Sequence, residues 1–302
     1  MPQGMIVKAL SGYYYVLPDG DGQDRVQCRA RGIFKKKNVS PLVGDRVIYE
    51  VTENGEGTVD EIMPRSTELI RPPVANVELA VLVFSVAEPV ISLPLLDKFL
   101  IHTESVGLET VIVFTKHDLL AEDTGGSSAQ TDFRRIRHIY ESIGYPIVTT
   151  SAMAGDGLES IRAHLQGRIS VFAGQSGVGK SSLLNALVPE LNLQTSEISH
   201  RLGRGRHTTR HVELIALEPA GWVADTPGFS QLDFMNVEAE QLADSFREFR
   251  TYSPGCRFRG CLHQHEPGCK VREAVEAKEI AATRYDHYLL FLTEIRDKKR
   301  RY

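Results

Sequence analysis

The sequence contains no long hydrophobic run. Its longest apolar stretch, residues 79–87, is far shorter than the roughly 20 residues that a helix needs to span a bilayer. The first six residues, MPQGMI, also lack the charged and apolar regions of a secretory signal peptide. We therefore expect a cytoplasmic globular protein with no membrane partner. Its 302 residues are enough for two or three domains.

Cysteine is scarce and unevenly distributed. Of the four cysteines, Cys28 stands alone and the other three lie between residues 256 and 269. Disulfides are rare in cytosolic proteins, so the tight cluster favours a metal site over cross-links. Cys28 is typical of a small buried core residue.

A large net charge is missing as well. The formal charge is −4, which does not by itself indicate nucleic-acid binding. Basic residues nevertheless gather in residues 25–37, 200–211 and 298–301. Each segment could be a solvated face or tail, but the three together favour an anionic partner.

Residues 1–70 predict a small all-β unit. Turn signals such as Asn54-Gly55 separate four β-rich runs, at residues 13–17, 25–28, 45–51 and 57–62. Their number and length suit a five-stranded barrel of the OB type. Such a barrel can bind single-stranded or looped RNA, or it can be only a packing or spacer domain. The segment alone favours neither.

The pattern of apolar residues changes after Arg71-Pro72-Pro73, which we interpret as a stiff linker. Buried strands now alternate with helical periodicity, the strands being predicted at residues 77–87, 110–114, 145–149 and 168–173. This alternation predicts an open α/β sheet that binds its ligand at the carboxyl ends of the strands.

A phosphate-binding pattern follows the last of these strands. Residues 174–182 read GQSGVGKSS, which fits G-x-x-x-x-G-K-[ST] at every fixed position. Lys180 is predicted to contact the β and γ phosphates and Ser181 to ligate Mg²⁺. The predicted nucleotide contacts of the loop are Gly174, Gln175, Ser176, Gly177, Val178, Gly179, Lys180, Ser181 and Ser182.

Two further elements suit the γ phosphate and its metal. Asp225-x-x-Gly228 follows paired strands at residues 212–217 and 222–224. Its carboxylate would hold Mg²⁺ through water and the Gly228 N–H would donate to the γ phosphate. Thr208 or Thr209, in a polar Gly- and Arg-rich stretch, is the expected second Mg²⁺ ligand and would be ordered by the triphosphate.

The stretch Thr115-Lys116-His117-Asp118 suits a guanine base. One carboxylate, that of Asp118, accepts both neighbouring donors of the guanine edge, whereas adenine presents an acceptor there. Lys116 would lay its stem against the base. Ser151-Ala152, after the third strand, would bring a backbone N–H to the base carbonyl.

The cysteine cluster reads Cys256-x₄-Cys261-x-His263-x₅-Cys269. Three thiolates and one imidazole favour Zn²⁺, and four protein ligands leave no open position, so the site is predicted to be structural. His265 is an alternative to His263. Helices are predicted at residues 237–250 and in two closing segments.

The motifs resemble those of the translation-factor-like GTPases, in rotated order, because the base-reading motifs precede the phosphate loop. With the OB-like barrel and the Cys/His cluster, they resemble one family over essentially the whole chain: ribosome small-subunit-dependent GTPase A (RsgA, also YjeQ or YloQ). The family pattern favours His263. The resemblance rests on residues 115–118, 151–152, 174–182, 205–209, 225–229 and 256–269.

The resemblance implies a multi-domain protein: an OB-type β-barrel (1–70), a circularly permuted α/β P-loop GTPase domain (71–234) and a zinc-binding α-helical domain (235–302). It implies a factor for late maturation of the small (30S) ribosomal subunit. Such a factor binds the subunit and its 16S rRNA and hydrolyses GTP slowly until the subunit stimulates it. We expect Mg²⁺ with GTP or GDP, one structural Zn²⁺, no DNA binding and a monomer.

Two positions depart from the common GTPase pattern. Thr115 stands where the base motif usually begins with Asn, and we expect the lost amide to loosen the tie between base site and phosphate loop. Phe229 stands where many GTPases carry the Gln that orients water. We therefore expect His207, beside Thr208, to position the water once the subunit orders residues 200–211, with Lys180 supplying charge.

Two other functions fit parts of the pattern. The protein could be an RNA- or ribosome-binding module in which GTP only locks a conformation. A metabolic phosphotransferase could use the same loop, but it needs a base for the substrate hydroxyl, and the sequence offers no candidate.

Overall fold

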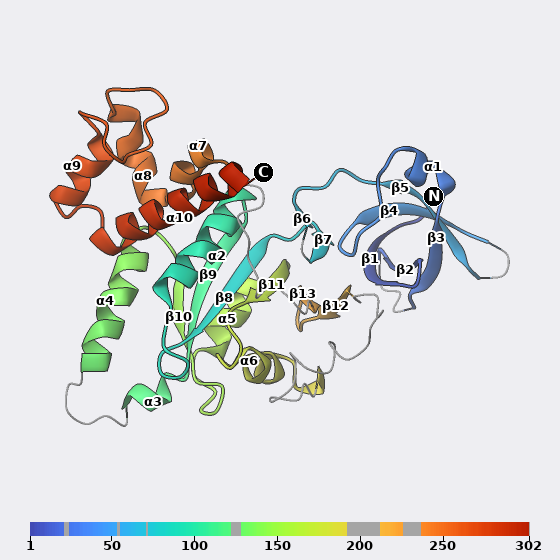
Figure 1. Ribbon diagram of the computed structural model, residues 1–302. Coiled ribbons are helices and arrows are strands. Elements are labelled where there is room, and N and C mark those ends of the chain that lie inside the picture. Colours follow the sequence, from blue (N-terminus) through green and yellow to red (C-terminus); the bar gives the residue numbers. More distant parts are fainter. Residues whose placement is uncertain are drawn as a thin grey trace.

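The computed structural model describes residues 1–20, 24–52, 55–70, 72–121, 128–191, 212–225 and 237–301. A β-barrel, a central α/β region and a helical region follow one another in space as they do in the sequence (Figure 1). Within this part of the chain, every helix is too short or too polar to span a bilayer.

The first region is a closed five-stranded barrel. Its strands pair in the order β1-β2-β3-β5-β4, and β4 returns to β1. All these pairings are antiparallel except that of β3 with β5. Cys28 is fully buried among valines, as predicted. The strands are β1 (Gln3–Leu10), β2 (Tyr13–Pro18), β3 (Val26–Ala30), β4 (Arg46–Val51) and β5 (Gly57–Ile62), with α1 (Gly32–Lys36) between β3 and β4.

The linker interpretation is wrong for the residues that follow Arg71. β6 (Glu68–Ile70) and β7 (Pro73–Ala75) form an antiparallel hairpin. The hairpin is fixed to the barrel, because Val74 bridges to Val43 and the Asn76 side-chain amide donates to the Gly44 carbonyl at 2.9 Å. Pro73 is tolerated because it begins its strand, where its missing N–H costs no ladder bond.

The central region is the predicted α/β sheet, with strand order β10-β9-β8-β11-β13-β12. All neighbouring strands are parallel except β12 and β13. Every residue of β8 and β11 is buried, as expected for strands covered on both faces. The strands are β8 (Leu79–Ser85), β9 (Glu109–Thr115), β10 (Ile147–Thr149), β11 (Ile169–Ala173), β12 (Val212–Ala216) and β13 (Trp222–Asp225).

Helices cover both faces of this sheet. On one face Phe99 of α2 packs edge-on against Phe84, and Phe133 of α4 against Phe114. On the other, α5 and α6 share a second buried cluster with β8 and β9. These helices are α2 (Leu93–Ser105), α4 (Ser128–Ser142), α5 (Leu158–Leu165) and α6 (Lys180–Leu187); the short α3 is Asp118–Ala121.

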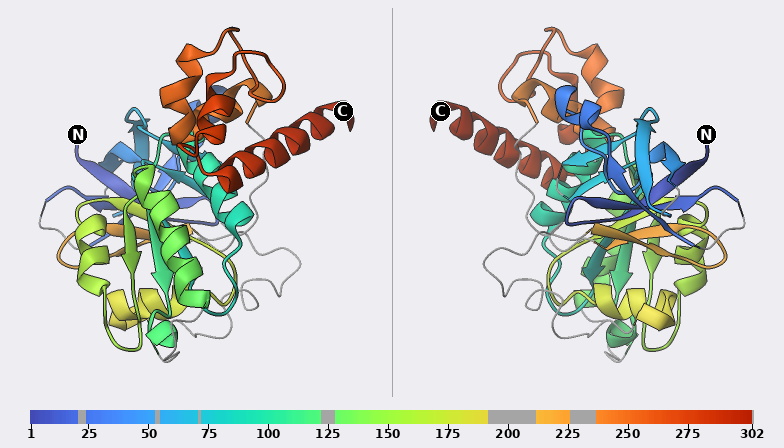
Figure 2. Two further views of the ribbon diagram at one scale, coloured as in Figure 1. Left: turned by 90° about the vertical axis from the view of Figure 1, so that its left-hand side faces the viewer. Right: turned by 90° about the vertical axis from the view of Figure 1, so that its right-hand side faces the viewer.

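The helical tail has a core of its own, rich in aromatic rings. The helix expected over residues 237–250 is interrupted, because Phe246 takes an extended backbone conformation (φ −100°, ψ 105°). The final helix projects well beyond the sheet (Figure 2). The tail helices are α7 (Ala239–Leu242), α8 (Arg247–Tyr252), α9 (Lys270–Glu276) and α10 (Ala282–Arg301).

Buried charges attach the tail to α2. Arg284 of α10, 1% exposed, donates to Asp97 of α2 at 2.5 Å and to Glu248 of α8 at 2.7 Å. Tyr140 of α4 donates to the same Asp97 carboxylate. Ile101 of α2 belongs to the core of the tail. Tail and α2 therefore share one buried interface.

Candidate nucleotide and metal sites

The phosphate loop joins β11 to α6, as predicted. Backbone φ is 149° at Gly174, 80° at Gly177 and 92° at Gly179. A Cβ on Gly174 would lie 2.1 Å from the Val83 carbonyl oxygen of the neighbouring strand, so only glycine fits where the loop leaves the sheet. Since α6 begins at Lys180, the unpaired N–H groups of its first turn border the loop and favour an anion there.

Lys180 folds back over the loop that precedes it. Its amine donates to the carbonyl oxygens of Gly174 (2.7 Å) and Gln175 (2.6 Å). Burial lowers the pKa of this amine to about 8. A phosphate in the loop would favour the charged form and raise that pKa.

Thr115 ties the base motif to the phosphate loop. Its hydroxyl donates to the Val178 carbonyl, and the Phe84 carbonyl lies 3.2 Å away. The expectation that the tie would be loosened by the loss of Asn is therefore wrong. A hydroxyl on the shorter side chain reaches the loop because Thr115 is buried at the end of β9, directly beside it.

Lys116 adds a second tie. It adopts a positive φ of 61°, and its amine donates to the Gly177 carbonyl at 3.0 Å and to the carbonyl of Glu88. Glu88 lies in the segment between β8 and α2, so three separate segments meet at this amine. The sequence pattern did not single out Glu88, because a backbone acceptor leaves no side-chain signature.

The two segments predicted to read the base lie side by side. The backbone N–H of His117 donates to the Thr150 carbonyl at 3.3 Å, and Asp118 begins α3 next to it. Ser151 closes the facing turn, since its hydroxyl accepts from Ala154 N–H at 3.1 Å. Asp118 and Ser151-Ala152 thus stand at the carboxyl ends of β9 and β10, as expected for one shared base pocket.

The remaining predicted residues are reached only in part. Asp225 is the last residue of β13. This strand pairs with β11, which leads into the phosphate loop. Only the backbone of Asp225 is described. His207, Thr208, Thr209 and Gly228 lie outside the described residues.

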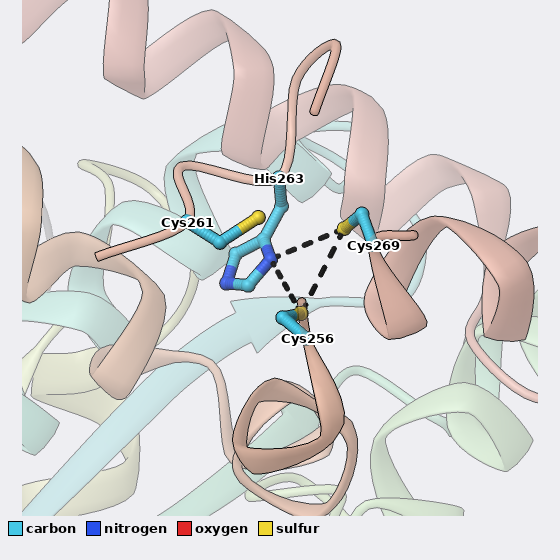
Figure 3. A group of neighbouring side chains, drawn as sticks. All are labelled: Cys256, Cys261, His263 and Cys269. Atoms are coloured by element: carbon cyan, nitrogen blue, oxygen red, sulfur yellow. Dashed lines mark hydrogen bonds between the residues drawn. The ribbon is translucent and has the colours of Figure 1, made fainter. Parts of the chain in front are cut away.

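The cysteine cluster of the tail converges on one point (Figure 3). One ligand atom from each of Cys256, Cys261, His263 and Cys269 lies within 4.8 Å of the others, so the group could hold a metal ion. His263 Nδ1 lies 3.3 Å from Cys269 Sγ and 3.7 Å from Cys256 Sγ. Sulfur ligands around tetrahedral zinc stand about 3.8 Å apart; the Cys256 and Cys269 sulfurs are 4.0 Å apart. The donor set and spacing fit such an ion.

Other residues orient this cluster. The hydroxyl of Ser253 lies 3.3 Å from His263 Nε2, the ring nitrogen that faces away from the thiols. Tyr285 donates to the His263 carbonyl at 2.6 Å. Glu266 accepts backbone N–H groups of the same turn, among them that of Leu262. Such surrounding contacts fix a ligand's ring and tautomer.

His263, not His265, belongs to the cluster. His263 is 2% exposed, whereas His265 is exposed and outside the group. Burial raises the pKa of the Cys261 thiol to about 12 and lowers the pKa of His263. A cation entering the site must therefore displace thiol protons but meets a neutral imidazole, so its affinity rises with pH.

The chain is similar to known proteins along its whole length. A family model described as RsgA GTPase matches residues 62–235, and one described as RsgA N-terminal domain matches residues 3–59. This chain belongs to the RsgA GTPase family. It is 54% identical to a protein of Geobacillus kaustophilus and 52% identical to one of Bacillus subtilis, both named small ribosomal subunit biogenesis GTPase RsgA, over 100% of each chain.

Solved RsgA-type structures share the fold. The circularly permuted GTPase YloQ superposes with a TM-score of 0.83 at 46% identity, over 99% of this chain and 96% of that one. YjeQ from Thermotoga maritima gives a TM-score of 0.85 at 38% identity, over 97% and 98%. The predicted family, the permuted GTPase fold and the preceding barrel are confirmed. As an RsgA family member, the chain is a GTPase.

Proposed function

We propose that this chain assists late maturation of the small (30S) ribosomal subunit in the cytoplasm. It binds the subunit and its 16S rRNA, and it hydrolyses GTP slowly until the subunit stimulates it. The observation that carries the proposal is the meeting of Thr115 and Lys116 with the phosphate loop. It occurs in a chain 54% identical along its length to a small ribosomal subunit biogenesis GTPase.

Guanine nucleotides are the proposed ligands. Asp118 accepts from the guanine edge, Ser151-Ala152 offers a backbone N–H to the base carbonyl, and residues 174–182 surround the phosphates. Ser181, Asp225 and either Thr208 or Thr209 hold Mg²⁺, which when bound neutralises charge that develops on the phosphates. Gly228 donates to the γ phosphate. The site is supported by the positive φ values of the loop glycines and by the half-buried Lys180 amine, which folds over the loop.

Zinc is the proposed metal of the tail. Cys256, Cys261, His263 and Cys269 would hold one ion per chain in a closed, structural site. The donor set of three thiols and one imidazole, of which His263 and Cys269 are buried, supports zinc over harder cations.

Hydrolysis is proposed to depend on residues 200–211. Phe229 can neither orient water nor accept a proton. His207 would therefore position the water, while Lys180 stabilises the charge on the γ oxygens. Arg204 and Arg206 could supply charge to the transition state, but we favour contact with ribosomal RNA, which would order the stretch.

The three proposed domains divide these tasks. Residues 1–70 form the RNA-binding barrel, residues 71–234 hold the nucleotide and residues 235–302 form the zinc-bound tail. The protein is proposed to act as a monomer, with no DNA as partner.

Turnover of GTP with and without purified small subunits tests this function. We expect slow basal hydrolysis, on the order of 10⁻⁴ per second for unaided Ras-type chemistry, and strong stimulation by the subunit. ATP should not be hydrolysed, and Asp118→Asn should prefer xanthine nucleotides. His207→Ala should bind GTP and subunit but lose most of the stimulation.

Each outcome separates the candidates. Hydrolysis of ATP as well as GTP would contradict the guanine assignment. Full stimulation of His207→Ala would move water positioning to a ribosomal group. Subunit binding that changes with nucleotide but without stimulated turnover would favour the module in which GTP only locks a conformation.

A further inference from the structure

The barrel and the GTPase sheet are one continuous sheet. β1 of the barrel pairs antiparallel with β12, with Lys8 opposite Glu213 and Ala9 opposite Val212 (Figure 1). β12 begins at Val212, directly after residues 200–211, the stretch predicted to hold the second Mg²⁺ ligand. It then pairs along β13, where Glu213 stands opposite Asp225. In the backbone register Glu213 thus has a barrel residue, Lys8, opposite it on one strand and Asp225, a predicted Mg²⁺ ligand, opposite it on the other.

The Glu213 carboxylate is held by the barrel at both oxygens. Lys8 donates to one oxygen and Arg25, just before β3, donates to the other, each at 2.7 Å. Burial would raise the pKa of Glu213, but the two cations outweigh burial and lower it. The carboxylate is therefore charged at neutral pH.

Both ion pairs cross from the barrel to the GTPase sheet. Other barrel pairs, such as Arg46 with Asp19, stay within the barrel. Val212 and Leu214, on either side of Glu213, are buried in the shared core. If β12 slid along β1, Glu213 would be separated from both cations. The two ion pairs therefore fix the register of β12 against β1.

We propose that Glu213 is a positioning residue that couples the nucleotide site to the barrel, by locking β12 in register with β1. The side chains of Lys8 and Arg25 stay 30% and 41% exposed, so phosphates of an RNA on the barrel can approach the same cations. The approach of RNA to Lys8 and Arg25 rests on the proposed function. The coupling within the chain does not.

Hydrogen exchange of the isolated protein tests the coupling without ribosomes. Protection of the β1 amides should differ between the GDP complex and the complex with a non-hydrolysable GTP analogue. Glu213→Gln keeps the side-chain shape but removes the charge, and it should reduce that difference by about two- to fivefold, the range of a half-exposed ion pair. Lys8→Met removes one of the two cations and leaves Arg25 paired, so it should reduce the difference less than Glu213→Gln does. The double variant should lose no more than Glu213→Gln alone.

A matched control exists at the other junction. Lys98 and Glu294 join α2 to α10 at 3.2 Å with similar exposure, so Glu294→Gln removes an ion pair of the same kind. It should leave the β1 difference unchanged. The proposal is overturned if β1 protection is the same in both nucleotide states, if Glu213→Gln behaves as wild type, or if Glu294→Gln has an equal effect.

A second measurement carries the coupling to the reaction. With small subunits present, Glu213→Gln should lower the stimulated kcat by about two- to fivefold and leave the KM for GTP unchanged. A lack of stimulation in wild type would contradict the proposed function but not the coupling, which the exchange experiment decides.

Discussion

The candidate nucleotide site and the candidate metal site are built in opposite ways. The nucleotide site collects segments that are far apart in the chain: the hydrogen bond from Thr115 to Val178 spans 63 residues. The candidate metal site takes all four potential ligands from residues 256–269. The first is positioned by strand ladders, which exist without any ligand. The second gathers three thiols in a loop that has little regular structure, so a bound ion is expected to contribute directly to its stability.

Loss of the metal should therefore have the largest effect. Cys261→Ser removes one of four ligands, and metal binding in zinc-finger peptides is worth about 10–16 kcal/mol. We expect the tail to lose protection from hydrogen exchange and metal analysis to find less than one zinc per chain. GDP affinity should be retained, because the nucleotide site is held by the sheet.

His265→Ala is the matched control, since this histidine lies two residues from His263 but outside the cluster. It should keep both zinc and the protected tail. A metal-free Cys261→Ser protein whose tail stays protected would show that the aromatic core alone is sufficient.

The same contrast explains what could be predicted from sequence. The metal ligands were predicted because their spacing is local, and the phosphate loop because its glycines and Lys180 form a fixed pattern. The closing strand β1 was missed: Gly4 to Val7 are all buried, so the strand shows no alternation. The barrel–sheet junction at Glu213 was missed too, because strand pairing between distant segments leaves no local signal.

The role of Thr115 shows the limit of pattern comparison. A departure from the usual Asn suggested a lost contact, but the contact is kept by a different side chain. Only the position of Thr115 beside Val178 reveals this. Likewise, the break at Phe246 depends on packing of its ring against Tyr288 and Phe249, which overrides helical propensity.

The next largest effect is expected at the interface between the helical tail and α2. Arg284→Met would leave buried Glu248 without its cation and Asp97 with only Tyr140 and His287 as partners, and breaking a buried pair costs about 3–5 kcal/mol. Chemical denaturation should show this loss. Arg250→Ala removes an exposed partner of Glu104 at the same interface and should cost less than about 1 kcal/mol. Equal effects of the two variants would mean that the buried network is not what holds the tail.

A smaller effect is expected at the tie within the nucleotide site. Thr115→Val keeps the shape but leaves the buried Val178 carbonyl without its donor, which costs about 1–3 kcal/mol. We expect GDP affinity to fall by at least about fivefold, because the loop is less ordered before binding. Thr115→Ser retains the hydroxyl and should bind GDP nearly as wild type does. Equal GDP affinity in wild type, Thr115→Val and Thr115→Ser would show that the hydrogen bond from Thr115 to Val178 does not contribute to nucleotide binding.

The smallest effect is the pH dependence of GDP affinity that the Lys180 amine causes. In the nucleotide-free protein, burial lowers the pKa of Lys180 to about 8. Bound phosphates raise that pKa. Below this pKa the amine is charged in both states, so it adds no pH dependence to GDP binding. Above it, binding must take up a proton. Affinity should therefore weaken as pH rises from 8 to 9, by at most about tenfold per unit. Titration calorimetry between pH 7 and 9 measures this, before guanine itself loses its N1 proton. Lys180→Gln should bind weakly at every pH and lose the slope. A slope that persists in that variant would assign the proton to another group.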